Sequence, residues 1–167
     1  MKSYMTSIRL TDTKVLLLLA LWSFGIQLFL SNDSPFFGLT HRIDSAWFFM
    51  EGKAFIIGMR PYVEFSDFKG PIIWLFYGIG YLLSPHDYHG MYIVSGVFYA
   101  LTLFFNYKTA KIFLKSDGRS LAATLPMIFV YFFPWFHFET RSEDLMLLFV
   151  AITLYALFKK LYAEKRD

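Results

Sequence analysis

Acidic and basic side chains gather in two segments of the sequence, and their types suit proton transfer and anion binding. A carboxylate can act as a general base, and a Lys or Arg can hold a phosphate group. A solvated loop that needs charge is the alternative for any single residue, but the clustering of acids with cations favours a polar site. The first segment is residues 31–89 and the second is residues 137–144; their ionisable residues include His41, Arg42, Asp44, Glu51, Lys53, Arg60, Glu64, Asp67, Lys69, His137, Glu139, Arg141, Glu143 and Asp144.

Two short motifs in these segments have a more specific chemistry. Lys69 precedes Gly70 and Pro71, and a proline in the first turn of a helix leaves amide donors exposed, which favours an anion there. Lys69 would add a point charge to the same place. Glu143 and Asp144 can bind a divalent cation through oxygen ligands, or they can cap the hydrophobic helix that follows them.

The composition decides what kind of element must position these residues. Of the 167 residues, 56% are hydrophobic, 22% are aromatic and only 17% are charged. Soluble domains average about 25% charged residues, and a soluble chain could not bury this much aromatic surface. The sequence therefore predicts an integral membrane protein. The net charge of +3 includes no basic run interleaved with stacking aromatics, so no nucleic-acid partner is expected. Cysteine is absent, which excludes thiolate metal sites and a cysteine nucleophile.

Uncharged stretches give the expected helices. A helix that crosses the hydrocarbon core needs about 20 residues. We expect one all-α transmembrane domain over residues 1–167, with spans at about 15–31, 90–107, 120–137 and 145–159. The stretches 71–85 and 145–158 are short, and their length alone does not decide whether each is a span or an interfacial segment.

The positive-inside rule decides whether the stretch 71–85 crosses the membrane. If it does not span and the N-terminus is cytoplasmic, eleven of the 16 Lys and Arg lie inside. If it does span, only four lie inside. The four-span arrangement is favoured, with both termini cytoplasmic. Its inside residues are Lys2, Arg9, Lys14, Lys108, Lys111, Lys115, Arg119, Lys159, Lys160, Lys165 and Arg166.

In this arrangement residues 32–89 form a long external loop. Loops of this length usually have structure of their own or a function. We expect two juxtamembrane helices in it, at about 44–57 and 71–84.

The segment Pro61-Tyr-Val-Glu-Phe-Ser-Asp-Phe-Lys-Gly-Pro71, following Asp44 after one short helix, resembles the first external loop of GT-C-type glycosyltransferases. This class includes protein O-mannosyltransferases and the lipid A aminoarabinose transferase. Its members have an acid soon after the first span, here Asp44, and a Lys-Pro-Pro or Lys-Gly-Pro that opens a second juxtamembrane helix. The stretch Arg141-Ser-Glu-Asp-Leu-Met-Leu-Leu-Phe149 is similar to the acidic motif that these families place before the fourth span.

The resemblance implies a function and roles for particular residues. It implies transfer of a sugar from a polyprenyl-phosphate donor to an acceptor on the extracytoplasmic side, with inversion at the sugar and with Asp44 as the base. The expected substrate-binding residues are Arg42, Glu64, Asp67, Lys69 and Arg141. A divalent cation on Glu143 and Asp144 is a further expectation, and a multi-pass protein of the bacterial inner membrane is the expected location.

The chain departs from the resemblance in length. GT-C-type transferases usually have many more spans, so we expect a split or truncated transferase or a small relative, completed by a second polypeptide that supplies further spans. The alternative is a non-enzymatic subunit or regulator of cell-envelope glycan assembly, or an inactive fragment. A small transporter is disfavoured because the spans carry almost no ionisable residue.

Overall fold

The computed structural model describes residues 10–37, 43–127 and 140–164. These residues form helices α1 (Asp12–Leu30), α2 (Ile43–Ile56), α3 (Pro71–Leu83), α4 (His89–Leu114), α5 (Asp117–Thr124) and α7 (Ser142–Glu164). The described part of the chain contains no β-sheet, only one isolated bridge between Pro61 and Phe65. The expected all-α fold is confirmed.

Three helices are long and apolar enough to cross a membrane, namely α1, α4 and residues Ser142–Tyr162 of α7. The protein is therefore an integral membrane protein with several spans. The expected span at 120–137 begins with α5, and its residues beyond 127 lie outside the described residues. Helices α2 and α3 lie at the two positions where juxtamembrane helices were expected, and both are shorter than a span.

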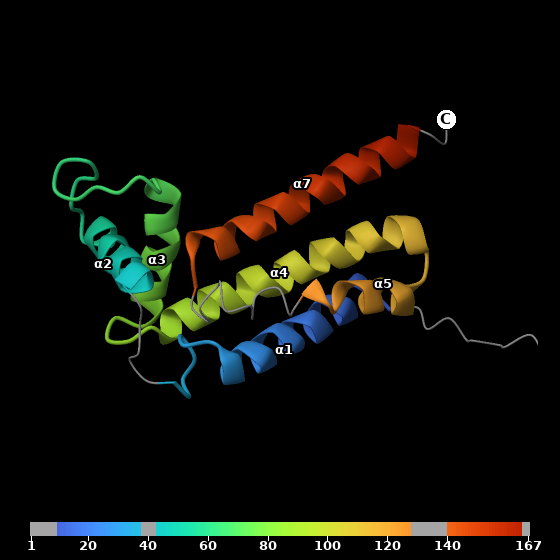
Figure 1. Ribbon diagram of the computed structural model, residues 1–167, viewed down its shortest axis with the longest axis horizontal. Helices are drawn as coiled ribbons and strands as arrows, with labels where there is room; N and C mark the ends of the chain where they lie inside the picture. The colour runs from blue at the N-terminus through green and yellow to red at the C-terminus, as the bar shows by residue number, and fades with distance from the viewer. Residues whose placement is uncertain (1–9, 38–42, 128–139, 165–167) are drawn as a thin grey trace, which may run out of the picture.

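Helix α4 is the centre of the molecule. It lies between α1 and α7, and the three run side by side (Figure 1). Polar side chains join α1 to α4: Ser23 donates to the Gly96 carbonyl at 3.0 Å, and Ser95 donates to Gln27 Oε1 at 2.8 Å. Because lipid gives no hydrophobic drive between helices, such hydrogen bonds help to hold spans together.

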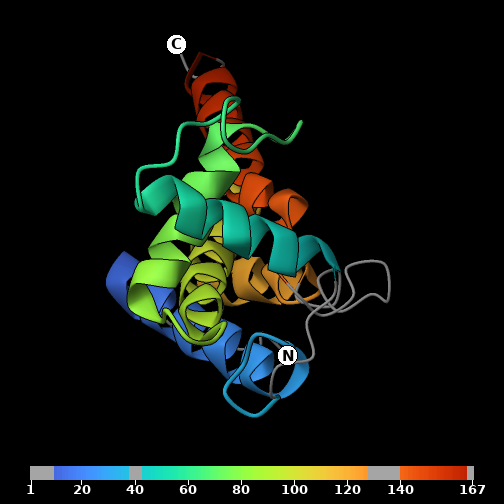
Figure 2. The same ribbon diagram turned by 90° about the vertical axis from the view of Figure 1, so that its left-hand side faces the viewer.

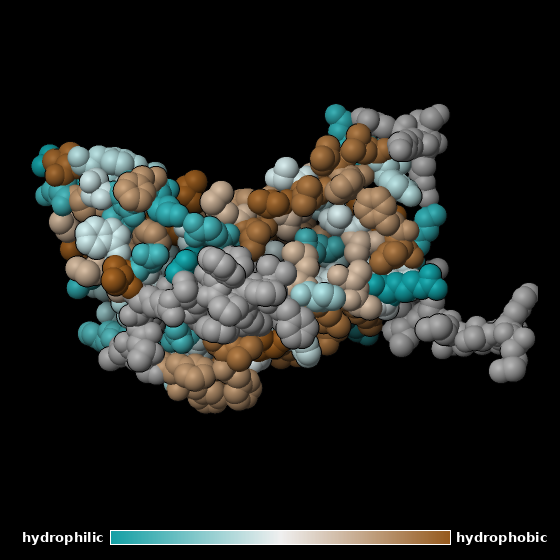
Figure 3. All heavy atoms as spheres, in the orientation of Figure 1, coloured by the Kyte–Doolittle hydropathy of each residue, from teal (hydrophilic) through white to brown (hydrophobic). Residues whose placement is uncertain are grey.

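Helices α2 and α3 pack together at one end of this bundle, and α2 lies across that end (Figure 2). Glycines let the two backbones meet: a Cβ on Gly52 would lie only 2.5 Å from the Gly78 nitrogen. Their shared core contains Phe48, Trp74 and Tyr77, together with Met91 of α4. On the face shown in Figure 3, hydrophilic residues lie over this end and again at the opposite end of the bundle, whereas α7 carries mainly hydrophobic side chains.

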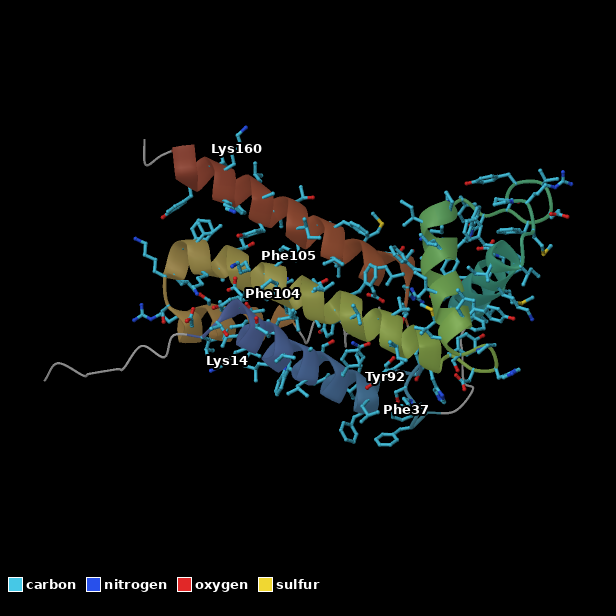
Figure 4. All side chains as sticks on the ribbon, turned by 180° about the vertical axis from the view of Figure 1, so that it is seen from behind. Lys14, Phe37, Tyr92, Phe104, Phe105 and Lys160 are labelled. Carbon is cyan, nitrogen blue, oxygen red and sulfur yellow. The ribbon has the colours of Figure 1, made fainter. Side chains whose placement is uncertain are left out.

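A different polar cluster lies at the opposite end of the bundle, where α4 meets α5. The buried Asp117 accepts hydrogen bonds from the Tyr107 hydroxyl at 2.7 Å and from the Leu10 backbone N–H at 2.8 Å, and its carboxylate lies 2.6 Å from Lys111 Nζ. Lys14 and Lys160 also lie toward this end, while Phe37 and Tyr92 lie toward α2 and α3 (Figure 4).

Candidate active site

A cavity of about 660 Å³ opens between the start of α2 and the loop that leads into α3. We call it the α2 cavity. Its walls combine carboxylates, a cation and aromatic rings: Ile43, Asp44, Trp47, Phe48, Ser66, Asp67, Phe68 and Lys69. Three of the residues singled out from the sequence, Asp44, Asp67 and Lys69, are therefore brought to one place by the fold.

Asp44 is in the first turn of α2, and its side chain is 61% exposed. Arg141 Nη2 lies 3.9 Å from Asp44 Oδ2, which is a long contact between the start of α2 and the residue before α7. An exposed carboxylate with a cation at this distance can still accept a proton from a bound group.

Lys69 connects the loop before α3 to α7. Its Nζ lies 2.7 Å from Glu143 Oε1, and Ser142 donates to the other oxygen of the same carboxylate at 2.7 Å. Gly70 adopts a φ of +83°, a conformation that glycine takes without strain, and Pro71 then occupies the first turn of α3. The local sequence thus turns the chain sharply between the lysine and the helix.

A second, apolar cavity of about 350 Å³ begins at Lys69 and follows the facing sides of α3 and α7. We call it the α3–α7 groove. Lys69 and Ser142 are its polar lining residues, and the remainder are hydrophobic: Ile72, Ile73, Phe76, Leu145, Met146 and Phe149. Lys69 lines both cavities, so the groove and the α2 cavity share one cation.

The start of α7 is fixed by a buried network. Asp144 Oδ2 accepts the backbone N–H of Arg141 at 2.9 Å, in the manner of a capping box. Asp144 Oδ1 is buried and has no hydrogen-bond partner within the described ranges. Asp33 Oδ2 accepts both the backbone N–H and the hydroxyl of Thr140, at 2.9 and 2.6 Å. The end of α1 and the start of α7 are thereby joined.

Neither Asp33 nor Glu51 has a specific role predicted from the sequence, although Glu51 was among the clustered ionisable residues. Asp33 lies just after the first expected span at 15–31, and an acid in that place was the available signal. Glu51 is buried in α2, where Trp47 Nε1 donates to one of its oxygens at 3.0 Å and Trp74 Nε1 donates to the other at 2.9 Å. Burial raises the pKa of Glu51 above its ordinary value, with a further contribution from the charge of Asp67, and the two indole donors oppose this shift.

One other predicted site residue, Glu64, does not line the α2 cavity. Glu64 accepts the backbone N–H of Arg60 at 2.5 Å and closes its own exposed turn. Arg42 lies outside the described residues.

The described residues contain no group of three or more carboxylates or histidines placed to hold a metal ion. Glu143 is paired with Lys69, and Asp144 caps α7. A divalent cation on these two residues stays a prediction.

No curated protein and no solved structure matches this chain. A family model does match, over residues 69–167, which is more than half of the chain. The matched region begins at the lysine shared by the two cavities and includes Arg141 and the acids at the start of α7. This chain belongs to the dolichyl-phosphate-mannose-protein mannosyltransferase family, a group of GT-C-type membrane glycosyltransferases.

Proposed function

We propose that the chain transfers a mannosyl group from a polyprenyl-phosphate donor to a hydroxyl acceptor in the α2 cavity. The observation that carries this proposal is that Asp44 and Lys69 line one cavity, and that an apolar groove begins at the same lysine. The family description names dolichyl-phosphate mannose, a donor with a long apolar chain, a phosphate and a sugar. The groove, the lysine and the cavity match these three parts in order.

Lys69 would hold the donor phosphate. An ammonium group has three N–H donors, and one of them points to Glu143 at 2.7 Å. The other two can bind phosphate oxygens, and the amide donors in the first turn of α3 favour an anion at the same place. Lys69 would then stabilise the negative charge that gathers on the departing polyprenyl phosphate.

Asp44 would be the general base. The acceptor oxygen attacks the anomeric carbon from the face opposite the phosphate, and a new carbon–oxygen bond forms there. The bond from that carbon to the phosphate oxygen breaks, and its electron pair leaves with the polyprenyl phosphate. The hydroxyl proton passes to Asp44. One displacement of this kind inverts the configuration of the sugar.

Arg141 and Asp67 would support these two residues. Arg141 lies 3.9 Å from Asp44 and is held in place through the Asp144 cap of α7. Asp67 lines the cavity and accepts its neighbour's backbone N–H at 2.5 Å, so its second oxygen is available to a sugar hydroxyl. Arg42 and Glu64 stay predicted substrate contacts.

The transfer reaction can be tested with membranes of the native host, which would also supply any second polypeptide that the reaction needs. Polyprenyl-phosphate [³H]mannose is added, and label is counted in the protein and glycan fractions. Membranes with the protein should incorporate label above membranes from a deletion strain. Equal incorporation in the two would contradict the proposal.

The location of the site can be tested separately. We propose that residues 32–89 face the outside of a bacterial inner membrane and that the segment around residue 118 is cytoplasmic. Phe68 is 99% exposed, and a Cβ on Gly118 would meet no atom within 4 Å, so both accept a cysteine without strain. The chain has no cysteine of its own. An impermeant maleimide should label Phe68→Cys but not Gly118→Cys on intact cells, and both after lysis; the reverse pattern on intact cells would refute this arrangement.

A further inference from the structure

Trp47 is an exposed aromatic residue of the α2 cavity whose indole N–H is bound by a buried carboxylate. It follows Asp44 by three residues on α2, so the two side chains share one face of the helix. Its side chain is 54% exposed, whereas the next two residues, Phe48 and Phe49, are buried. The indole therefore presents surface to the cavity while its neighbours enter the core.

A hydrogen bond to the buried Glu51 fixes the orientation of the Trp47 indole. Trp47 Nε1 donates to Glu51 Oε1 at 3.0 Å, and Trp74 Nε1 donates to Glu51 Oε2 at 2.9 Å. Trp74 is completely buried, packs against the rings of Phe65 and Tyr62, and so gives the carboxylate a rigid support. Burying a carboxylate carries a free-energy cost. The Glu51 carboxylate is nevertheless buried, and it holds the exposed indole of Trp47 in one orientation.

We propose that the exposed face of Trp47 is the platform on which the sugar ring of the donor stacks, and that Glu51 is the positioning residue for it. This inference rests on the proposed function. A hexose has faces made of C–H groups and edges made of hydroxyls. The electron-rich face of an indole attracts the positive side of C–H bonds, and it is the largest such surface that a side chain offers.

The position of Trp47 suits this role. A sugar whose phosphate is held at Lys69 must extend into the α2 cavity, because the groove on the other side of the lysine is apolar. Stacking on Trp47 would keep the ring on the same helix face as Asp44, one turn away from the base. The hydroxyl edges would then face Asp67 and Ser66, which are polar lining residues of the cavity.

An interfacial anchor is the competing role for an exposed tryptophan in a membrane protein. An anchor uses its indole N–H toward lipid headgroups. The Trp47 N–H instead points to Glu51, a residue that is 4% exposed. The geometry thus favours a fixed platform over an anchor.

The test compares two lipids in nanodiscs: polyprenyl-phosphate mannose and polyprenyl phosphate without the sugar. The parent should prefer the lipid that carries mannose. Trp47→Ala should lower its affinity for that lipid by roughly three- to tenfold, as expected for the loss of one aromatic contact, and leave the affinity for the sugar-free lipid unchanged. Trp47→Phe should keep most of the preference, since a smaller aromatic face survives.

Glu51→Gln tests the positioning role. Glutamine offers one carbonyl acceptor and an NH₂ group, so one of the two indole N–H donors loses its acceptor. The KM for the donor should rise while kcat changes little, and Trp47 fluorescence should be quenched more strongly by a soluble quencher. Trp22→Ala is the matched control, because Trp22 is similarly exposed, at 45%, on α1; it should leave the lipid preference unchanged.

The outcomes separate the two proposals. A Trp47→Ala protein that keeps the parent's preference for mannose, or that loses affinity for both lipids equally, overturns the platform and leaves the proposed function standing. A parent that binds neither lipid overturns the proposed function itself.

Discussion

Two carboxylates at opposite ends of the bundle have very different surroundings. Asp117 is 7% exposed, and both of its oxygens accept hydrogen bonds from the chain itself, from Tyr107 and from the Leu10 backbone. Asp44 is 61% exposed in the wall of a cavity, and the described residues bring it one cation, Arg141, at 3.9 Å. Groups of the protein itself bind both oxygens of Asp117. The Asp44 carboxylate faces a cavity that has room for a ligand.

The difference separates an acid that holds the fold together from an acid that is a candidate for function. Both lie in the first turn of a short helix, so the sequence alone does not tell them apart. The Lys111 ammonium group, aided by the Leu10 N–H and the Tyr107 hydroxyl, lowers the pKa of Asp117 to about 2. A carboxylate held so firmly as an anion is a poor proton acceptor, but it joins α4, α5 and the start of α1.

The largest effect is expected from Asp44→Asn. The amide cannot accept the acceptor's proton, and general bases typically contribute about 10²–10⁴-fold to rate. Transfer of label from polyprenyl-phosphate [³H]mannose should fall by that factor, while the unfolding temperature and donor binding stay close to those of the parent. Asp12→Asn is the matched control, since Asp12 is an exposed acid in the first turn of α1. Transfer at the parent's rate in Asp44→Asn would show that Asp44 is not the base.

A smaller effect is expected from Lys69→Ala. Hydrogen bonds to charged groups contribute about 1.5–3 kcal/mol, so affinity for polyprenyl phosphate in nanodiscs should fall by roughly ten- to a hundredfold. Lys69→Arg should keep part of the affinity, because the charge remains but its geometry changes. Lys115 is an exposed lysine beyond the end of α4, and the Lys115→Ala control should bind polyprenyl phosphate as the parent does. If Lys69→Ala also binds the lipid like the parent, the phosphate must be held elsewhere.

The smallest effect on transfer is expected at the other end of the bundle. Asp117→Asn should lower the free energy of unfolding by roughly 2 kcal/mol, because a pKa depressed from 3.8 to about 2 corresponds to stabilisation of that order. Transfer per folded molecule should not change. A large loss of transfer in the folded variant would break the distinction between the two ends.

The pH dependence of the same variant sharpens that distinction. Since the folded-state pKa of Asp117 lies below its ordinary value, its stabilisation is complete above about pH 3.8 and is lost as the pH falls toward 2. The difference in unfolding midpoint between parent and Asp117→Asn should therefore shrink from pH 5 to pH 2. A difference that persists at pH 2 would mean that packing around residue 117, not its charge, stabilises the fold.

The sequence predicted the all-helical fold, and it singled out several residues that the fold brings to the candidate site. Hydropathy and charge placement predicted helices near those observed, because each depends on residues close together in the chain; α1 covers Asp12–Leu30 where 15–31 was expected. The sidedness of the membrane, which the charge pattern also predicts, awaits the labelling experiment. The region of the family match begins at Lys69, which the sequence had also singled out.

The contacts that complete the site join distant parts of the chain. Lys69 meets Glu143 across 74 positions, and Asp33 meets Thr140 across 107. No local pattern encodes such pairs. The burial of Glu51 could not be predicted for another reason: a charged residue on a short helix is expected to face solvent, and only the packing of α3 against α2 encloses it between two indoles.

The glycine contact between α2 and α3 fixes the distance between the two helices that flank the α2 cavity. The helix with Asp44 and Trp47 meets the helix that follows Lys69 backbone to backbone, at Gly52 and Gly78. No rotamer change can absorb an added methyl group there, so even Gly52→Ala must displace a whole helix by a large part of an ångström. In the proposed reaction this backbone contact would set the spacing between Asp44 as base and Lys69 as phosphate ligand, and a change of sugar or acceptor would have to come from the cavity's lining instead.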